Sequence, residues 1–165
     1  MVVGNPYKFA ILYEKVTEWN IDDTFCNGIL FYFLNGVMFP RQLTTATLSC
    51  EILRLREKLK EPQIINCELF DMSKEEVFAA IYNSTLSGDI IDCYNHFDIT
   101  PSSFSDQDCY IFAVSNGVQV RVFASTLIYV PEESRHNLED AKIEEVLMDI
   151  NDFKNIGYQM QEQIC

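Results

Sequence analysis

The feature that most constrains the fold is a predicted β-hairpin over residues 109–125. Two runs rich in Val, Ile, Phe and Tyr meet at Asn116-Gly117, and Asn-Gly between apolar runs favours a type I′ turn with positive φ at both central residues. After the turn every second residue from 118 to 122 is Val, with Gln119 and Arg121 between, which predicts one buried and one solvated face. Before the turn both faces are apolar, so we expect that arm to lie inside a sheet.

The rest of the chain adds strands and helices around this hairpin. A second Asn-Gly pair, Asn35-Gly36, predicts another hairpin after the apolar run 28–34. Further strands are expected at residues 8–16, 42–48, 64–70, 126–130 and 143–148, and a polar loop at 132–140. Helices are expected at 50–60 after Ser49, at 74–82 after a capping box of Ser73 and Glu76, and from Asp149 or Asn151 to about residue 163. This pattern predicts one α+β domain over residues 1–165, with a mainly antiparallel β-sheet and two or three helices packed on it.

The chain is strongly acidic, with 25 Asp and Glu against 12 Lys and Arg and a formal net charge of −13 at pH 7. Phosphate contacts need clustered Lys and Arg, so this balance argues against direct nucleic-acid binding and favours basic partners. Acidity also keeps a protein soluble, and that explanation stays open. The excess of acidic over basic residues is greatest at residues 131–152, which contain eight acidic residues and two basic ones, Arg135 and Lys142.

The residues that could support catalysis or metal binding form no recognisable set. The six cysteines, at positions 26, 50, 67, 93, 109 and 165, contain no CxxC pair, and the histidines are His96 and His136. Cys93 and His96 have a C-x-x-H spacing, but a structural zinc needs four ligands and no further pair has a suitable spacing. Nothing in the sequence orients His96 as the base of a dyad with Cys93 or Cys109, and no nucleotide-binding, GxSxG or HExxH motif is present. The sequence therefore predicts no enzyme, no cofactor and no metal.

We also expect no targeting or membrane segment. Its first residues, MVVGNPYKFAILYEK, lack a basic segment followed by an apolar one, so we expect no signal peptide. No apolar run approaches the roughly 20 residues that a membrane-spanning helix needs. Because the cysteines are scattered, we expect a cytoplasmic protein with six free thiols.

Several short patches resemble one protein family. They are GNPYKFAILYE at residues 4–14, EWN at 18–20, FPRQLTTATLSCE at 39–51 and EESRHNLED at 132–140. In these patches, and in its Asn35-Gly36 hairpin, the chain resembles the bacterial polymorphic-toxin immunity proteins of group forty-two, of the contact-dependent inhibition type. The resemblance implies a small cytoplasmic protein, encoded beside a secreted or contact-delivered toxin, that neutralises this toxin by binding it. It supplies no catalytic or binding residues, because toxin contacts are specific to each cognate pair.

The charge and the resemblance together predict a partner and a surface. Many delivered toxins are nucleases with basic clefts, to which an acidic inhibitor is steered electrostatically. We therefore expect the C-terminal domain of a cognate toxin, blocked stoichiometrically, to be the partner, with no nucleic acid and no membrane. The candidate contact residues are Glu132, Glu133, Glu139, Asp140, Glu144, Glu145 and Asp149, for which an ordinary solvated face is the alternative interpretation. The rival hypothesis is a small cytoplasmic ligand-binding or regulatory module without catalysis, which predicts a deep pocket lined by aromatic residues.

Overall fold

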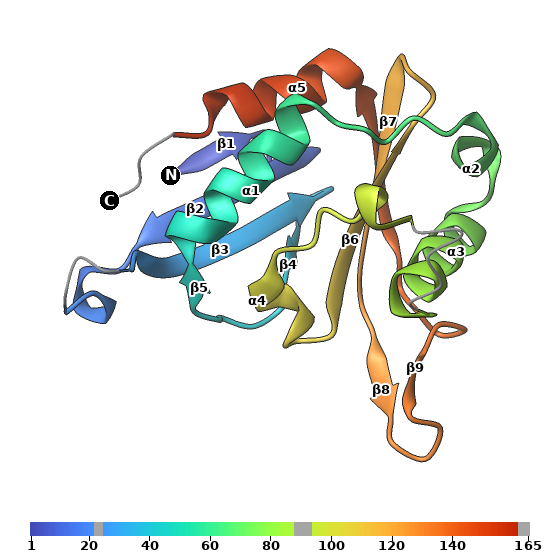
Figure 1. Cartoon of the computed structure of the whole chain (residues 1–165), viewed down its shortest axis with the longest axis horizontal. Coiled ribbons are helices and arrows are strands. Elements are labelled where there is room, and N and C mark those ends of the chain that lie inside the picture. Colours follow the sequence, from blue (N-terminus) through green and yellow to red (C-terminus); the bar gives the residue numbers. More distant parts are fainter. Residues whose placement is uncertain (22–24, 88–93, 162–165) are drawn as a thin grey trace.

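The computed structural model describes residues 1–21, 25–87 and 94–161, whose arrangement is shown in Figure 1. Its strands form antiparallel sheets with helices packed against them, so the predicted α+β class is confirmed. The strands fall into three hydrogen-bonded groups. The first sheet contains β1 (Val2–Gly4), β2 (Phe9–Lys15), β3 (Asn27–Leu34), β4 (Val37–Phe39) and β5 (Ala46–Thr47); the second contains β6 (Cys109–Ser115), β7 (Gln119–Thr126) and β10 (Glu144–Asp149); the third contains β8 (Ile128–Val130) and β9 (Arg135–Asn137).

The central hairpin is confirmed, since β6 pairs with β7 in antiparallel register. The middle strand of the second sheet is β7, which lies between β10 and β6, and not the arm before the turn as predicted. The outer side of β6 makes isolated bridges, Ile65 with Ser115 and Asp98 with Phe112. These segments cover β6, whose residues are all buried except Tyr110.

The turn of this hairpin differs from the predicted type I′ turn on Asn116-Gly117. The Asn116 N–H donates to the Gln119 carbonyl at 3.2 Å, so the two central residues are Gly117 and Val118. Only Gly117 has positive φ, at 93°, as expected for Gly at the first position of a type II′ turn. The side chain of Asn116 bonds across the turn, where it accepts hydrogen bonds from the N–H groups of Val118 and Gln119 at 3.0 and 2.8 Å. Val118 therefore does not join the buried face of β7, and it is 65% exposed.

The type I′ geometry occurs instead in the hairpin of β3 and β4. Asn35 and Gly36 both have positive φ, at 52° and 80°, and Leu34 pairs with Val37 on either side. This confirms the second predicted hairpin. The side chain of Asn35 donates to the carbonyl of Glu145 on β10 at 2.9 Å, so this turn also joins the two larger sheets.

The helices begin and end at α1 (Leu48–Lys60), α2 (Cys67–Asp71), α3 (Lys74–Ser87), α4 (Ser102–Ser105) and α5 (Ile150–Gln159), with short 3₁₀ turns at Thr17–Trp19 and Tyr94–Phe97. Figure 1 shows α1 and α5 side by side over the first sheet, while α2 and α3 lie beside the second. Gly157 allows the close approach of α1 and α5, because a Cβ at this position would lie 2.9 Å from Cβ of Leu59. On the other side, Phe78 of α3 packs on Phe112 of β6 with ring centroids 4.9 Å apart.

The N-termini of α3 and α5 have the caps that the sequence predicts. Ser73 and Glu76 form the capping box in both directions, at 3.1 and 3.3 Å between N–H and oxygen. The pKa of Glu76 is lowered by the hydrogen bonds that its carboxylate accepts, first from the hydroxyl and then from the N–H of Ser73. Asp149 caps α5 by accepting the N–H of Asn151 at 2.7 Å. The expected end of this last helix, at about residue 163, lies outside the described residues.

Three predicted boundaries are wrong. The segment 64–70 is not a strand, because Asn66 accepts the N–H of Leu69 at 3.0 Å and caps α2. Helix α1 begins at Leu48 with Thr47 as its N-cap, ahead of the predicted Ser49. The strand expected at 42–48 is reduced to the two residues of β5. At residues 64–70 this local side-chain hydrogen bond outweighs the apolar pattern.

The disulfide state is also corrected. Cys26 is disulfide-bonded, whereas Cys50, Cys67 and Cys109 carry free thiols. The expectation of six free thiols is therefore wrong at Cys26, and the cysteines no longer support the expected cytoplasmic location. Sequence spacing could not show this, since a disulfide depends on which Cα atoms the fold brings within about 7 Å. Residues 93 and 165, the two other cysteines, lie outside the described residues.

Arg121 of β7 forms the main polar network inside the second sheet. Its Nε lies 2.5 Å from Oε1 of Glu145 on β10, and one terminal nitrogen donates to the carbonyls of Phe70 and Met72. The guanidinium also lies over the ring of Phe123, 4.9 Å from its centroid. Only 11% of the Arg121 side chain is exposed. This one cation therefore joins β7, β10 and the α2–α3 connection.

We predict that Gly117→Val lowers the free energy of unfolding by about 1–2 kcal/mol, the cost of left-handed backbone for an L-residue. Nothing lies within 4 Å of a Cβ at this position, so the cost comes from the backbone and not from a clash. Urea unfolding measures it, with Val118→Ala as the control at the neighbouring exposed position. Equal midpoints for the two variants would contradict the turn geometry.

We predict that Arg121→Met lowers the free energy of unfolding by about 3–5 kcal/mol, because it leaves Glu145 and two backbone carbonyls without their partner. The matched control is Arg135→Met, which removes an exposed ion pair with Glu133 and should change stability by at most about 1 kcal/mol. Denaturant titration of both variants compares them directly. Equal losses would show that the Arg121 network is not the stronger one.

Candidate functional site

The candidate site is built on a two-stranded ribbon, β8 and β9, that continues from the end of β7. Its paired residues are Ile128 with Asn137, Tyr129 with His136, and Val130 with Arg135. Figure 1 shows this ribbon extending away from the two larger sheets. Strand β9 lies within the segment expected to be a polar loop, so that prediction is wrong for Arg135–Asn137. Its three polar residues show no alternation of apolar and polar positions, which is the signal that identifies a half-buried strand.

Four of the seven candidate acidic residues lie on this ribbon or at its root. Glu132 and Glu133 are exposed in the turn between β8 and β9, and Glu133 lies 2.6 Å from Nε of Arg135. Glu139 and Asp140 are exposed just after β9. The side chain of Asn137 fixes this root: it accepts the N–H of Glu139 at 2.9 Å and donates to the carboxylate of Asp140 at 2.9 Å.

The other three candidates lie on β10 and have different surroundings. Glu145 is paired with Arg121, Asp149 caps α5, and Glu144 is half-buried opposite Ala124. Glu144 and Asp149 are also separated by about 17 Å along the strand, at about 3.4 Å per residue. The structure therefore does not bring all seven acidic residues into one compact patch.

The ribbon carries apolar surface beside its charges. The side chains of Ile128 and Tyr129 are 69% and 48% exposed, although Leu127 just before them is buried. Exposed large apolar residues next to charged ones are typical of protein interfaces. Sequence analysis did not select these two residues, because a short apolar run is equally typical of a buried strand.

His136 attaches the ribbon to the body of the protein. Its Nε2 lies 2.7 Å from Oδ1 of Asp108, and its Nδ1 forms a hydrogen bond with the hydroxyl of Tyr82. The rings of Tyr110 and Tyr129 pack edge-on against it, with centroids 5.6 and 5.3 Å away. The imidazole is 11% exposed. Both of its nitrogens are thus used to connect β9 with α3 and with the residue that precedes β6.

This cluster does not have the properties of a nucleophilic site. Burial raises the pKa of Tyr82 and that of Tyr110, so both hydroxyls keep their protons at neutral pH. Burial likewise raises the pKa of Cys109 to about 12, which removes the thiolate that a Cys109 dyad would need. No group of three or more His, Cys, Asp or Glu residues within the described ranges could hold a metal. Cys93, which the sequence does not support as a partner of His96, lies outside those ranges.

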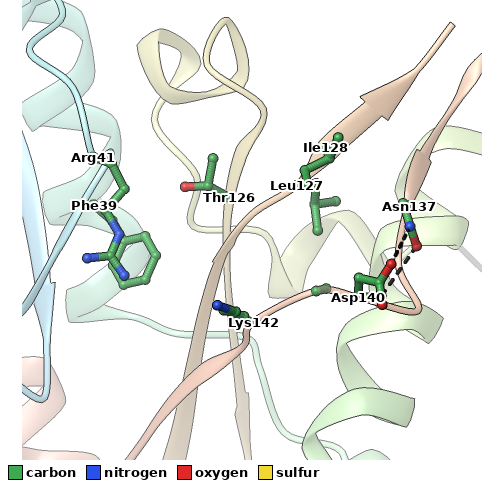
Figure 2. Close-up of a pocket in the computed structure, with 9 residues that line it drawn as sticks. Phe39, Arg41, Thr126, Leu127, Ile128, Asn137, Asp140 and Lys142 are labelled. Carbon is green, nitrogen blue, oxygen red and sulfur yellow. Dashed lines mark hydrogen bonds between the residues drawn. The ribbon is translucent and has the colours of Figure 1, made fainter.

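A pocket of about 280 Å³ lies at the root of the ribbon. Figure 2 shows residues of its walls, which come from three parts of the chain. Phe39 ends β4 and Arg41 follows it; Thr126 ends β7, Leu127 comes next and Ile128 begins β8; Asn137 ends β9, and Asp140, Ala141 and Lys142 lie between β9 and β10. Small-molecule sites have volumes of about 300–1,000 Å³ and mostly apolar and aromatic walls. Phe39 is the single aromatic residue in this lining. A second pocket, of about 550 Å³ between α1 and α4, has no aromatic residue in its lining, so neither matches the pocket that the rival hypothesis predicts.

Within the part of the chain that the structure describes, no helix is both long enough and apolar enough to cross a membrane.

The comparisons with known proteins identify a similar fold and one family. The fold resembles the crystal structure of CdiI from Burkholderia dolosa AUO158, with a TM-score of 0.72, 23% sequence identity and 96% of each chain covered. Among curated proteins, none matches this sequence. The sequence model described as immunity protein 42 matches residues 1–163, which confirms the resemblance found in the short patches. The chain therefore belongs to the immunity protein 42 family.

Proposed function

We propose that this protein neutralises a cognate toxin in the cytoplasm by binding its C-terminal domain stoichiometrically, without catalysis, and that the toxin is a nuclease. Membership of an immunity family supports the neutralising role. The observation that carries the proposed mode of action is the β8–β9 ribbon, which combines exposed apolar residues with an acidic tip on a fixed base.

The composition of the ribbon supports a protein partner. Tyr129 supplies a large amphipathic side chain with few rotatable bonds, and aromatic residues of this kind often dominate binding energy at interfaces. Ile128 adds apolar area beside it. The contacts of His136 with Asp108 and Tyr82 hold the base of the ribbon, so less conformational freedom is lost on binding.

The negative net charge of the protein supports a basic toxin as its partner. A net charge of −13 attracts a protein with a positive nucleic-acid cleft and raises the association rate. We propose Glu132, Glu133, Glu139 and Asp140 as direct contacts, because all four are exposed. Glu144, Glu145 and Asp149 of β10 add to the negative electrostatic potential that attracts the toxin. We do not propose Glu145 and Asp149 as direct contacts, because both already have partners within the fold.

The alternative function is a small cytoplasmic ligand-binding or regulatory module. It would need a deep aromatic pocket, and the two pockets described above support it less well than the exposed ribbon supports a protein interface.

We predict that converting Glu132, Glu133, Glu139 and Asp140 to Lys slows association with the toxin domain encoded beside this gene by about tenfold or more at low salt. The matched control converts four exposed acidic residues of α1 and α2 and their flanks, Glu57, Glu61, Glu68 and Asp71. Four reversals of two charges each take the net charge from −13 to −5 in both variants. Any difference between them therefore reports the position of the charges and not their sum.

Stopped-flow binding across a salt series gives the rates, and titration of toxin activity gives the stoichiometry. We expect inhibition to be complete near one equivalent and the ribbon variant to associate more slowly than the control variant. Inhibition at catalytic amounts would contradict stoichiometric blocking, and equal association of the two variants would exclude the ribbon as the charged contact.

A further inference from the structure

The pocket at the root of the ribbon has a charge opposite to that of the whole protein. Two of its nine lining residues are cations, Arg41 and Lys142, and one is an acid, Asp140. The two cations come from segments about one hundred residues apart in the sequence. In Figure 2 the amine of Lys142 points toward the side of the pocket where Arg41 lies over the ring of Phe39.

Neither cation is neutralised within the described parts of the chain. Arg41 contacts the ring of Phe39, 5.2 Å from its centroid, and neither Arg41 nor Lys142 has an ion pair with a carboxylate there. Asp140, the acid in the same lining, is held by Asn137 through both its carboxylate and its N–H. Arg41 also lines an adjoining hollow with Asp106 and Asp108.

The surroundings favour an anionic group at the mouth of the pocket. Phe39, Leu127 and Ile128 give it apolar walls, while Arg41 and Lys142 are exposed and accessible to a partner. A partner that covers the pocket excludes water, which strengthens a charge pair. The hydroxyl of Thr126 is the remaining polar side chain in the lining. With a volume of about 280 Å³, the pocket lies just below the range of small-molecule sites, which suits part of a protein surface better than a metabolite.

We propose that this pocket receives an Asp or Glu side chain of the toxin, whose carboxylate pairs with Lys142 and Arg41 while the ribbon contacts the toxin beside it. This inference rests on the proposed function, since the partner is the same toxin. The pocket directly follows the ribbon through Ile128 and Asn137, which belong to both. A partner seated on the ribbon therefore covers the mouth of the pocket.

The acidic residues and the cationic pocket would then have different roles in toxin binding. The acidic residues attract any basic toxin, whereas the cationic pocket accepts a toxin that presents a carboxylate at this point and repels one that presents Lys or Arg. Like charges placed opposite each other are a common means of excluding wrong partners.

The test is the dissociation constant of the toxin domain with Lys142→Glu, with Lys142→Met and with the control Lys15→Glu, which reverses an exposed cation on β2. Both charge reversals take the net charge from −13 to −15, which strengthens the long-range attraction to a basic toxin. Weaker binding by Lys142→Glu alone thus cannot come from total charge. We expect its dissociation constant to rise about tenfold or more and that of Lys142→Met to rise less, while Lys15→Glu binds as well as wild type or better.

A charge-swap scan identifies the partner group. Each exposed Asp and Glu of the toxin is changed to Lys, and we expect one of these variants to restore the binding of Lys142→Glu. Thermal unfolding of each immunity variant checks that it is folded. If wild type binds the toxin and Lys142→Glu binds it equally well, the inference is wrong and the proposed function stands; if wild type does not bind, both are wrong. Saturable binding of inorganic phosphate to the pocket, with toxin affinity unchanged by Lys142→Glu, would replace the inference with a free-anion site.

Discussion

The partly buried ion pair between Arg121 and Glu145 is the interaction on which the arrangement of the second sheet depends. Taking a guanidinium out of water is costly unless its donors are satisfied, and Arg121 meets this requirement with Glu145 and two backbone carbonyls of the α2–α3 connection. The carbonyl of Glu145 in turn accepts the side chain of Asn35 from the first sheet. Two sheets and a helical connection are therefore fixed around one strand, β7.

The ribbon begins where β7 ends, so its position depends on that fixed strand. His136 makes a second attachment, to Asp108 and Tyr82, and the residues of the tip, 131–135, are exposed. A recognition element on a rigid base can vary in sequence without disturbing the core. This arrangement suits an inhibitor whose partner differs from one cognate pair to the next.

Much of the local structure could be predicted from the sequence because its causes are local. The two Asn-Gly hairpins, the capping box of Ser73 and Glu76, and the Asp149 cap each depend on residues within a few positions of one another. The turn at residues 116–119 was misplaced by one residue because the side chain of Asn116 bonds across the turn, a preference that competes with the left-handed backbone. The 64–70 segment was misassigned for a similar reason, since Asn66 starts a helix inside an apolar run.

The candidate site was predictable only in part. Charge along residues 131–152 led to the segment that contains most of the ribbon, and Glu132, Glu133, Glu139 and Asp140 are exposed there. The sequence could not show that Glu145 forms an ion pair with Arg121 inside the fold, or that His136 has two polar partners. Nor could it show that Arg41 and Lys142 line one pocket. These facts depend on contacts between residues far apart in the chain, for which a single sequence has no periodic signal.

The central claim is that the ribbon and its root form the surface that meets the toxin. Amide hydrogen exchange of this protein, alone and with one equivalent of the toxin domain, tests it most directly, because it reports every region at once. We expect slower exchange in the complex at residues 127–142, with α1 and α5 unchanged. Protection confined to α1 and α5, with the ribbon exchanging as fast as in the free protein, would contradict the account.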